Sequence, residues 1–233
     1  MTGSASGPDA LAREAAEWMV ACLGEGSGKV AVALSGGSTP KRLYELLASD
    51  GFVRRMPWDR VHWFWGDERF VPPDDPASNY RMVREAMLDP VRVPESHIHP
   101  VPTVGLSPDE AAAAYERTLK DFHGSSDLET PLFHLVLLGL GTNGHFASLF
   151  PGTPALEERR AWVVPVTPEG EKTRITLTYP PLESCRHAAF LVSGADKRDV
   201  LARVCAGEAD LPASHYRPSG ELRWLTDSAA AGR

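Results

Sequence analysis

The side chains best suited to chemistry lie in short polar segments next to apolar runs. Residues 35–39 read Ser-Gly-Gly-Ser-Thr and stand directly before Pro40. The two glycines allow a sharp turn with exposed N–H groups, the helix expected from Pro40 adds a partial positive charge, and two hydroxyls add donors. The segment lacks the GxxxxGK spacing of a P-loop. It predicts a phosphate site, and the alternative is a glycine-rich turn with a helix cap.

A second segment, residues 139–145, reads GLGTNGH and ends on His145. It matches the G-x-G-x-x-G pattern of dinucleotide-binding proteins. However, Pro151 follows too soon for the usual long helix, and no second strand brings Glu157 or Glu158 to a ribose. The segment is therefore expected to present His145 at a strand end. A neutral imidazole there could act as a general base near pH 7, and the alternative is a histidine hydrogen-bonded within a turn.

Charged side chains form the third group of candidates. Asp67 and Arg69 lie two residues apart after another apolar run. A carboxylate and a guanidinium at this spacing could bind a polar substrate or orient a histidine, and the alternative is a solvated charged turn. Arg174 precedes an apolar run and Lys197 begins an expected helix. Each of these two cations, taken alone, fits an ordinary surface charge.

Neither a metal site nor a disulfide framework is expected. His97 and His99 form an HxH pair, but Pro100 and Pro102 place this pair in a loop, and no carboxylate spacing completes a site. The cysteines are odd in number, far apart and without a CxxC motif. They are Cys22, Cys185 and Cys205. We expect reduced thiols, and neither a metal nor another cofactor.

Alternating apolar runs and amphipathic stretches must position these segments. We expect strands over residues 30–34, 61–65, 133–140, 162–166, 175–178, 188–192 and 222–225. We expect helices over residues 10–23, from Pro40 with Thr39 as N-cap, over 78–88, over 107–122 behind a capping box, and over 197–205. Strands that are apolar throughout and alternate with helices indicate a mostly parallel α/β sheet covered on both faces. Sites in such sheets lie beyond the carboxyl ends of the strands.

Length and charge narrow the class of protein. The 233 residues suit one α/β domain spanning 1–233, and the loop 90–108 is the candidate boundary of a small extra lobe. The formal net charge is −7, from 24 Lys+Arg against 31 Asp+Glu, so we expect no extended basic face for nucleic acid or anionic membranes. The N-terminal segment lacks the features of a signal peptide, and the most apolar run is too short to span a membrane. A cytoplasmic location is expected.

Taken together, the segments resemble the 6-phosphogluconolactonase family of the pentose phosphate pathway. The matching pieces run in the family's order over nearly the whole chain: SGGSTP (35–40), WGDERFVPPDDPASNY (65–80), GLGTNGHFASLFPG (139–152), TRITLT (173–178), SGADK (193–197) and LPASHYRP (211–218). The resemblance implies a Rossmann-like α/β fold that glucosamine-6-phosphate deaminases share. It also implies hydrolysis of 6-phospho-D-glucono-1,5-lactone to 6-phospho-D-gluconate without a metal, by a monomer or weak dimer.

The resemblance implies a role for each candidate residue. His145 matches the base that activates water, while Asp67 and Arg69 match polar active-site positions. Arg69 or a backbone N–H would stabilise the oxyanion, and Asp67 would either orient His145 or bind a sugar hydroxyl. The phosphate-binding positions are Gly36, Gly37, Ser38, Thr39, Arg174 and Lys197.

The chain departs from the family pattern at Asn143, where the family often has Asp. An Asn cannot accept a proton at pH 7, and Phe150 stands where the deaminases place a Glu. Both differences favour a lactonase over a deaminase or aldose–ketose isomerase on the same fold. A third hypothesis, a sugar-phosphate sensor without catalysis, has no support in the sequence, and His145 speaks against it.

Overall fold

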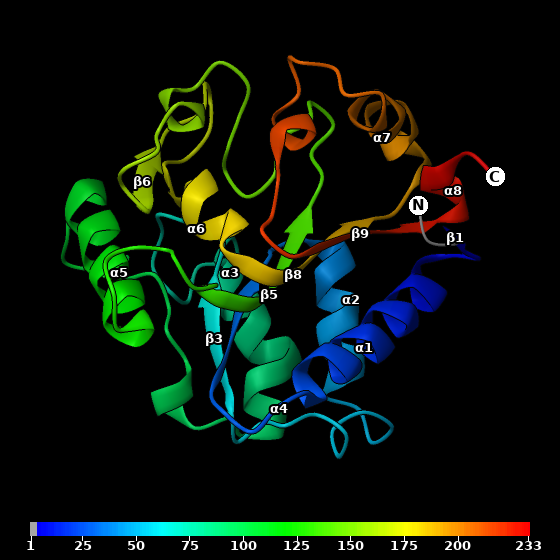
Figure 1. The fold of residues 1–233 in the computed structure, drawn as a ribbon, viewed down its shortest axis with the longest axis horizontal. Helices are drawn as coiled ribbons and strands as arrows, with labels where there is room; N and C mark the ends of the chain where they lie inside the picture. Colours follow the sequence, from blue (N-terminus) through cyan, green and yellow to red (C-terminus); the bar gives the residue numbers. More distant parts are fainter. Residues whose placement is uncertain (1–3) are drawn as a thin grey trace.

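A six-stranded sheet organises the computed structural model of the chain, which is described over residues 4–233 (Figure 1). Every neighbouring pair of its strands is parallel. The strands lie in the order β1 (Ser4–Ala5), β9 (Glu221–Asp227), β8 (Cys185–Val192), β5 (Phe133–Gly139), β2 (Val30–Leu34) and β3 (Val61–Trp65). The predicted α/β fold with a mostly parallel sheet is confirmed.

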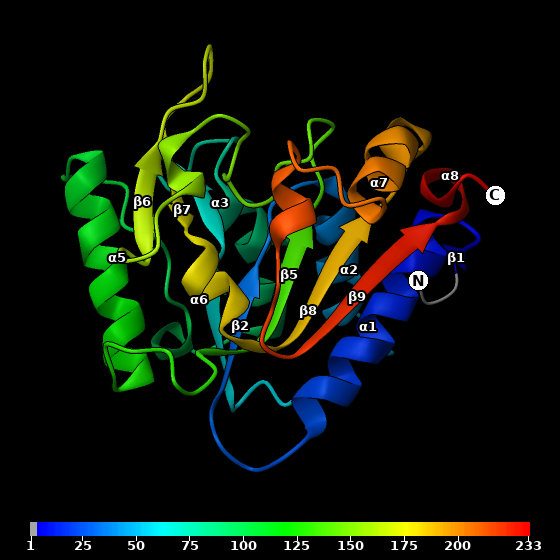
Figure 2. The same ribbon diagram turned by 45° about the horizontal axis from the view of Figure 1, so that its top comes forward.

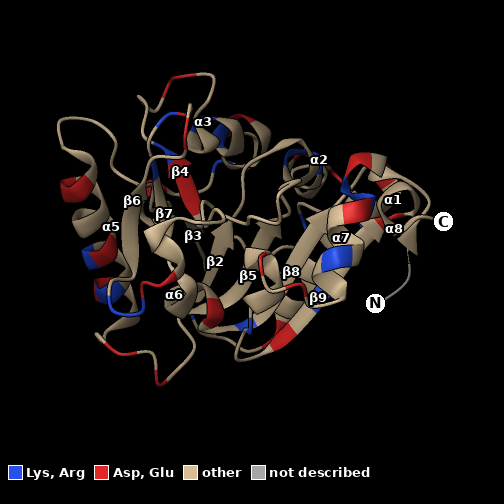
Figure 3. Cartoon of the chain, turned by 90° about the horizontal axis from the view of Figure 1, so that it is seen from above, with Lys and Arg blue, Asp and Glu red and all other residues tan. Residues whose placement is uncertain are grey.

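Helices cover both faces of this sheet, which explains why its central strands are apolar throughout. Figures 2 and 3 show α1 (Pro8–Gly24) and α2 (Ser38–Leu47) on one face and α6 (Tyr179–Glu183) on the other. Every residue of β2 and of β3 is buried. The remaining helical elements are α3 (Asn79–Val83), η1 (Arg84–Leu88), α4 (Asp89–Val91), η2 (Glu95–His97), α5 (Pro108–His123), η3 (Pro154–Leu156), η4 (Ala195–Lys197), α7 (Arg198–Cys205), η5 (Pro212–His215) and α8 (Ser228–Ala231).

A second, three-stranded sheet lies beside the first and was not expected. It consists of β4 (Asp67–Arg69), β7 (Arg174–Leu177) and β6 (Val163–Val166), and both of its strand pairs are antiparallel. The segments 162–166 and 175–178 were therefore wrongly assigned to the parallel sheet. Both were correctly identified as strands, but β7 pairs with β4, about one hundred positions earlier in the chain, and β6 pairs with β7. Helix α5 packs on β6 and β7.

Strand β4 was not predicted as a strand, since all three of its residues are charged, two of them acidic and red in Figure 3. Only Gly66 separates β3 from β4, so the chain passes directly from the edge of the large sheet into the small one. Asp67 and Glu68 are nevertheless buried, since β7 and the following loop cover them. The second sheet, and not the loop 90–108, forms the addition to the parallel core.

Two predicted helices illustrate how local sequence sets boundaries. Helix α5 begins with the expected capping box, in which Ser107 and Glu110 exchange hydrogen bonds with each other's backbone, and it ends at Gly124 in the left-handed region. The predicted helix 78–88 begins one residue later, after Ser78 as N-cap, but its second half is a π-helical turn. No helix within residues 4–233 is long and apolar enough to cross a membrane.

Candidate active site

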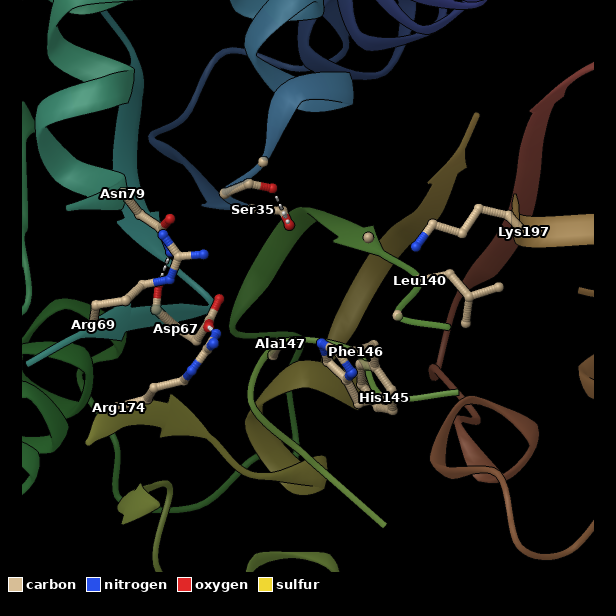
Figure 4. Close-up of a pocket in the computed structure, with 14 residues that line it drawn as sticks. Ser35, Asp67, Arg69, Asn79, Leu140, His145, Phe146, Ala147, Arg174 and Lys197 are labelled. Atoms are coloured by element: carbon tan, nitrogen blue, oxygen red, sulfur yellow. Dashed lines mark hydrogen bonds and ion pairs between the residues drawn. The ribbon is translucent and has the colours of Figure 1, made fainter. Parts of the chain in front are cut away.

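A cavity of about 240 Å³ opens at the carboxyl ends of β2 and β5, next to β4. This is where the fold class predicts a site. Figure 4 shows Asp67, Arg69 and Arg174 on one side of the cavity, Lys197 on the opposite side, and His145 between them. The lining residues are Ser35, Gly36, Gly37, Asp67, Arg69, Asn79, Gly139, Leu140, Gly141, His145, Phe146, Ala147, Arg174 and Lys197.

Glycine is required at positions 36 and 37 for two different structural reasons. A Cβ on Gly36 would lie 2.0 Å from Oδ1 of Asn79, so glycine is what admits the Asn79 amide to the cavity. Gly37 has a φ of 103°, a conformation that side chains disfavour, and it is the N-cap of α2. The backbone of this segment therefore approaches the cavity closely, as predicted.

The prediction for Ser38 and Thr39 was wrong in its detail. Helix α2 begins at Ser38 instead of Pro40, with Gly37 and not Thr39 as N-cap. As a result Ser38 is exposed and Thr39 partly exposed, and neither lines the cavity. The N–H groups of the first helical turn have no helical carbonyl to bond, so they are the donors that α2 offers an anion.

The buried carboxylate of Glu68 fixes the loop that delivers Asn79. It accepts hydrogen bonds from the backbone nitrogens of Arg69, Asn79 and Tyr80, each at 2.7 Å, and from the Ser78 hydroxyl at 3.1 Å. Burial raises the pKa of Glu68, while the three backbone N–H groups act in the opposite direction. Asn79 itself donates to the carbonyl of Asp67 at 2.9 Å. The loop after β4 is thus tied to the strand that lines the cavity.

The imidazole of His145 is held on three sides. Its Nδ1 lies 2.6 Å from Oδ1 of Asn143. The ring stacks on Phe150, with 4.2 Å between centroids and 29° between planes. A Cβ on Gly141 would lie 2.1 Å from Nδ1, so the second glycine of the predicted loop is needed for the ring to fit. In this structure the glycine-rich segment makes room for the imidazole, a role unrelated to binding a dinucleotide.

Burial lowers the pKa of His145, which favours the neutral imidazole. The negative charges of Asp67 and Glu171 oppose this shift, while the positive charges of Arg174 and Lys197 add to it. A neutral imidazole near pH 7 is the form in which a histidine can accept a proton.

Asp67 is buried and held by a neighbour other than His145. The hydroxyl of Ser148 donates to its Oδ2 at 2.6 Å, and Nη1 of Arg174 lies 4.0 Å from the same oxygen. Within residues 4–233 no hydrogen bond joins Asp67 to His145, whose Nδ1 is engaged by Asn143. Of the two roles left open by the sequence, binding a substrate hydroxyl fits this geometry better than orienting the imidazole.

Two arginines, Arg69 and Arg174, line one side of the cavity. Arg174 is ion-paired with Glu171, and its Cζ lies 5.2 Å from the centroid of the Phe150 ring. Nη1 of Arg69 donates to the carbonyl of Ala77 at 2.7 Å. The Nε atoms of both arginines are buried without a hydrogen-bond partner in the part of the chain that is described.

Lys197 reaches the cavity from the end of η4. Its side chain is mostly buried, and its Nζ lies 3.5 Å from Oδ2 of Asp196, which is largely exposed. Asp227 at the end of β9 fixes the preceding turn by accepting from the Ser193 hydroxyl at 2.6 Å and from the Gly194 nitrogen at 3.2 Å. The sequence-predicted residues that the structure brings together are Gly36, Gly37, Asp67, Arg69, His145, Arg174 and Lys197.

The sequence interpretation missed three residues that shape the site: Asn79, Asn143 and Phe150. Asn79 lies within the segment 65–80 already noted for its resemblance, and the Ser-Asn pair after a proline-rich loop is a helix-start signal. Asn143 and Phe150 were noted only as departures from other proteins. Nothing in their spacing reveals that both contact the imidazole of His145.

His97 and His99 lie apart from the cavity and pack against β3. Nε2 of His99 lies 3.0 Å from Nδ1 of His62, and the ring of His97 lies 4.4 Å from that of His62. Among the described residues, no group of three or more His, Cys, Asp or Glu side chains is arranged to hold a metal ion.

Known proteins share both this sequence and this fold. The sequence profile of the family described as Glucosamine-6-phosphate isomerases/6-phosphogluconolactonase matches residues 6–224. The chain is 47% identical to a 6-phosphogluconolactonase of Nostoc sp. over 206 residues, 87% of this chain and 84% of that protein. It superposes on the 6-phosphogluconolactonase of Trypanosoma brucei with a TM-score of 0.87 at 27% identity, covering 99% of this chain and 97% of the other.

A monomeric glucosamine-6-phosphate deaminase superposes with a TM-score of 0.84 at 21% identity, covering 99% of this chain and 98% of the other, which shows a common fold alone. The family profile, by contrast, covers most of the chain, and the similarity to the Nostoc protein extends over nearly nine-tenths of it. The chain therefore belongs to the family of glucosamine-6-phosphate isomerases and 6-phosphogluconolactonases.

Proposed function

We propose that this protein hydrolyses 6-phospho-D-glucono-1,5-lactone to 6-phospho-D-gluconate, a step of the oxidative pentose phosphate pathway. The observation that carries the proposal is the meeting of His145 with Arg174 and Lys197 in one cavity. A base that favours its neutral form and two cations suit a substrate with a phosphate at one end and a reactive carbonyl at the other. The similarity to 6-phosphogluconolactonases over most of the chain supports the same reaction.

The phosphate is expected to bind the segment 36–39 and the two cations. The first-turn N–H groups of α2 and the backbone of Gly36 and Gly37 would donate to phosphate oxygens. Arg174 and Lys197 would neutralise its charge from opposite sides of the cavity. The buried carboxylate of Asp67, which lies 4.0 Å from Nη1 of Arg174, would accept a sugar hydroxyl.

Hydrolysis then needs one base, one oxyanion donor and one returned proton. His145 takes a proton from water, and the oxygen attacks the carbonyl carbon C1 of the lactone. Negative charge on the carbonyl oxygen is stabilised by Arg69 or a backbone N–H, an interaction worth about 3 kcal/mol for one well-placed donor. The imidazolium returns its proton to the ring oxygen as the C1–O bond breaks, which opens the ring and leaves a carboxylic acid that ionises.

We further propose that residues 1–233 act as one cytoplasmic enzyme domain, as a monomer or weak dimer. Free thiols at Cys22, Cys185 and Cys205 suit a reducing compartment.

The test is hydrolysis of the lactone, measured against its spontaneous background, with and without His145. We expect His145→Gln to lower kcat by about 10² or more with an unchanged fold, as loss of a general base does. The matched control is His215→Gln, which alters an exposed histidine whose Nε2 contacts the carbonyl of Ala209. Glucosamine 6-phosphate should release no ammonia. Near-wild-type turnover by His145→Gln would remove His145 from this role.

A further inference from the structure

The side-chain amide of Asn143 makes two contacts with His145. Its Oδ1 lies 2.6 Å from Nδ1 of the ring and 3.2 Å from the backbone nitrogen of His145. The second contact, from a side chain to the nitrogen two residues later, is that of an Asx turn. Both contacts therefore lie within the local sequence Asn-Gly-His.

These two contacts determine where the proton of the neutral imidazole lies. A backbone N–H can only donate, so the Asn143 atom that faces it is the oxygen and not the amide nitrogen. An amide oxygen can only accept, so Nδ1 of His145 must be the donor in the shorter contact. Neutral imidazole has a single N–H, so Nε2 keeps its lone pair. Within residues 4–233, no hydrogen bond engages Nε2.

We propose that Asn143 is a positioning residue, which holds the proton on Nδ1 of His145 and leaves Nε2 to take the proton from water. The inference rests on the proposed function, because it names the atom through which His145 acts. Gly141 and Phe150 fix where the ring lies, but neither offers a side-chain acceptor that would choose between its two nitrogens. That choice falls to Asn143.

Because the Asn143 side chain is uncharged, it also affects the pH range over which the enzyme is active. The charged side chains around the ring are Asp67 of β4, Glu171 and Arg174 of the β6–β7 hairpin, and Lys197 of η4. Asn143 adds no charge to this set. A carboxylate in its place would lie at hydrogen-bond distance from the imidazolium, stabilise it and raise the pKa of His145. The amide thus keeps the base unprotonated at lower pH than Asp would.

A direct test observes the ring without using activity. Two-dimensional ¹⁵N–¹H NMR at pH 8 distinguishes the two neutral tautomers, and the His145 signals are assigned as those that vanish in His145→Gln. We expect the Nδ1–H form in the wild type and a mixture of tautomers in Asn143→Ala. Finding the Nε2–H form in the wild type would overturn the inference, whether or not the protein hydrolyses the lactone.

The kinetic test compares pH profiles of kcat/KM between pH 5 and 7.5. We expect Asn143→Asp to move the acidic limb upward by about one pH unit or more, because the added carboxylate stabilises the imidazolium. Asn143→Ala should lower kcat about tenfold or more with KM little changed. Thr142→Ala, at the exposed neighbouring position, is the matched control and should do neither.

The outcomes separate the two proposals. If the wild type lacks lactonase activity, the proposed function fails, while the NMR measurement still decides the tautomer. If the wild type is active and His145→Gln is not, an unmoved acidic limb in Asn143→Asp or full kcat in Asn143→Ala would show that Asn143 does not position the base.

Discussion

Imidazole rings lie in two different environments in this protein. In the cavity, the His145 ring is surrounded by charged side chains, and among residues 4–233 it is hydrogen-bonded through Nδ1 only. At the outer edge of β3, His62 contacts His99 through ring nitrogens 3.0 Å apart, and the His99 ring stacks on Phe64 with 4.4 Å between centroids. His97 completes this second group, which we call the histidine cluster. The first environment leaves a nitrogen available to a substrate, and the second uses nitrogens and ring faces for packing.

Burial lowers the pKa of a histidine in both places. It lowers the pKa of His62 to about 4, with positive neighbours adding to the effect, and it lowers that of His145. A shifted pKa alone therefore does not mark a catalytic histidine. What distinguishes the cavity is that three cationic side chains, Arg69, Arg174 and Lys197, line it together with the ring.

The largest predicted effect on substrate binding comes from removing a cation from the cavity. Lys197→Ala should raise KM about 10- to 100-fold and change kcat little, because a charged hydrogen bond to phosphate is worth about 1.5–3 kcal/mol. Steady-state kinetics on the lactone measure this, and calorimetry with inorganic phosphate measures the same loss without turnover. Arg174→Ala should raise KM at least as much, since Arg174 is more buried than Lys197.

The control for this prediction is a cation outside the cavity. Arg203→Ala alters an exposed side chain on α7 that pairs with Glu208 and Asp210, and it should leave KM unchanged. If neither Lys197→Ala nor Arg174→Ala raises KM, the phosphate binds elsewhere and the proposed orientation of the substrate is wrong.

Much of the parallel sheet could be predicted because its strands are buried on both faces. The boundaries 30–34 and 61–65 were predicted correctly, since each strand is a short apolar run ended by glycine or serine. The second sheet could not be predicted in the same way. Strand β4 consists of charged residues, and it is a strand only because β7, far away in the sequence, supplies its partner.

The sequence predicted the parts of the site that glycines and strand ends position. It missed the parts that depend on contacts between side chains. Glycines and a strand end placed His145 and the segment 36–37 in one cavity. The hydroxyls of Ser38 and Thr39 were misplaced because the choice of N-cap shifts a helix start by two residues, which propensities do not resolve. The contacts that Phe150 makes with His145 and Arg174 depend on a loop geometry that no pattern in the sequence encodes.

The second prediction tests the histidine cluster. In the folded state the pKa of His62 is about 4, below its ordinary value of 6.5. Above pH 6.5 His62 is neutral in both the folded and the unfolded state, and its full contribution to the free energy of unfolding is present. As the pH falls from 6.5 toward 4, the unfolded state takes up the proton first, so the free energy of unfolding decreases.

We expect His62→Phe to reduce the loss of stability between pH 7.5 and 5 by about 1–2 kcal/mol, without affecting kcat. The effect is smaller than the full pKa difference implies, because water reaches the partly exposed His97 and His99. Urea unfolding at the two pH values measures it, and taking the difference cancels any constant cost of the substitution. An unchanged pH dependence would show that the cluster does not titrate during unfolding.

The smallest predicted effect concerns Glu171, which pairs with Arg174 in the absence of substrate. Because the phosphate must compete with this carboxylate for the guanidinium, Glu171→Gln should lower KM about twofold to threefold, as expected for an ion pair with one exposed partner. Glu171 also favours the protonated form of His145, so the substitution should move the acidic limb of kcat/KM slightly toward lower pH. Both changes should shrink at high salt, because nearly half of the Glu171 side chain is exposed to solvent. A raised KM would contradict competition and would show instead that Glu171 orients Arg174 toward the phosphate.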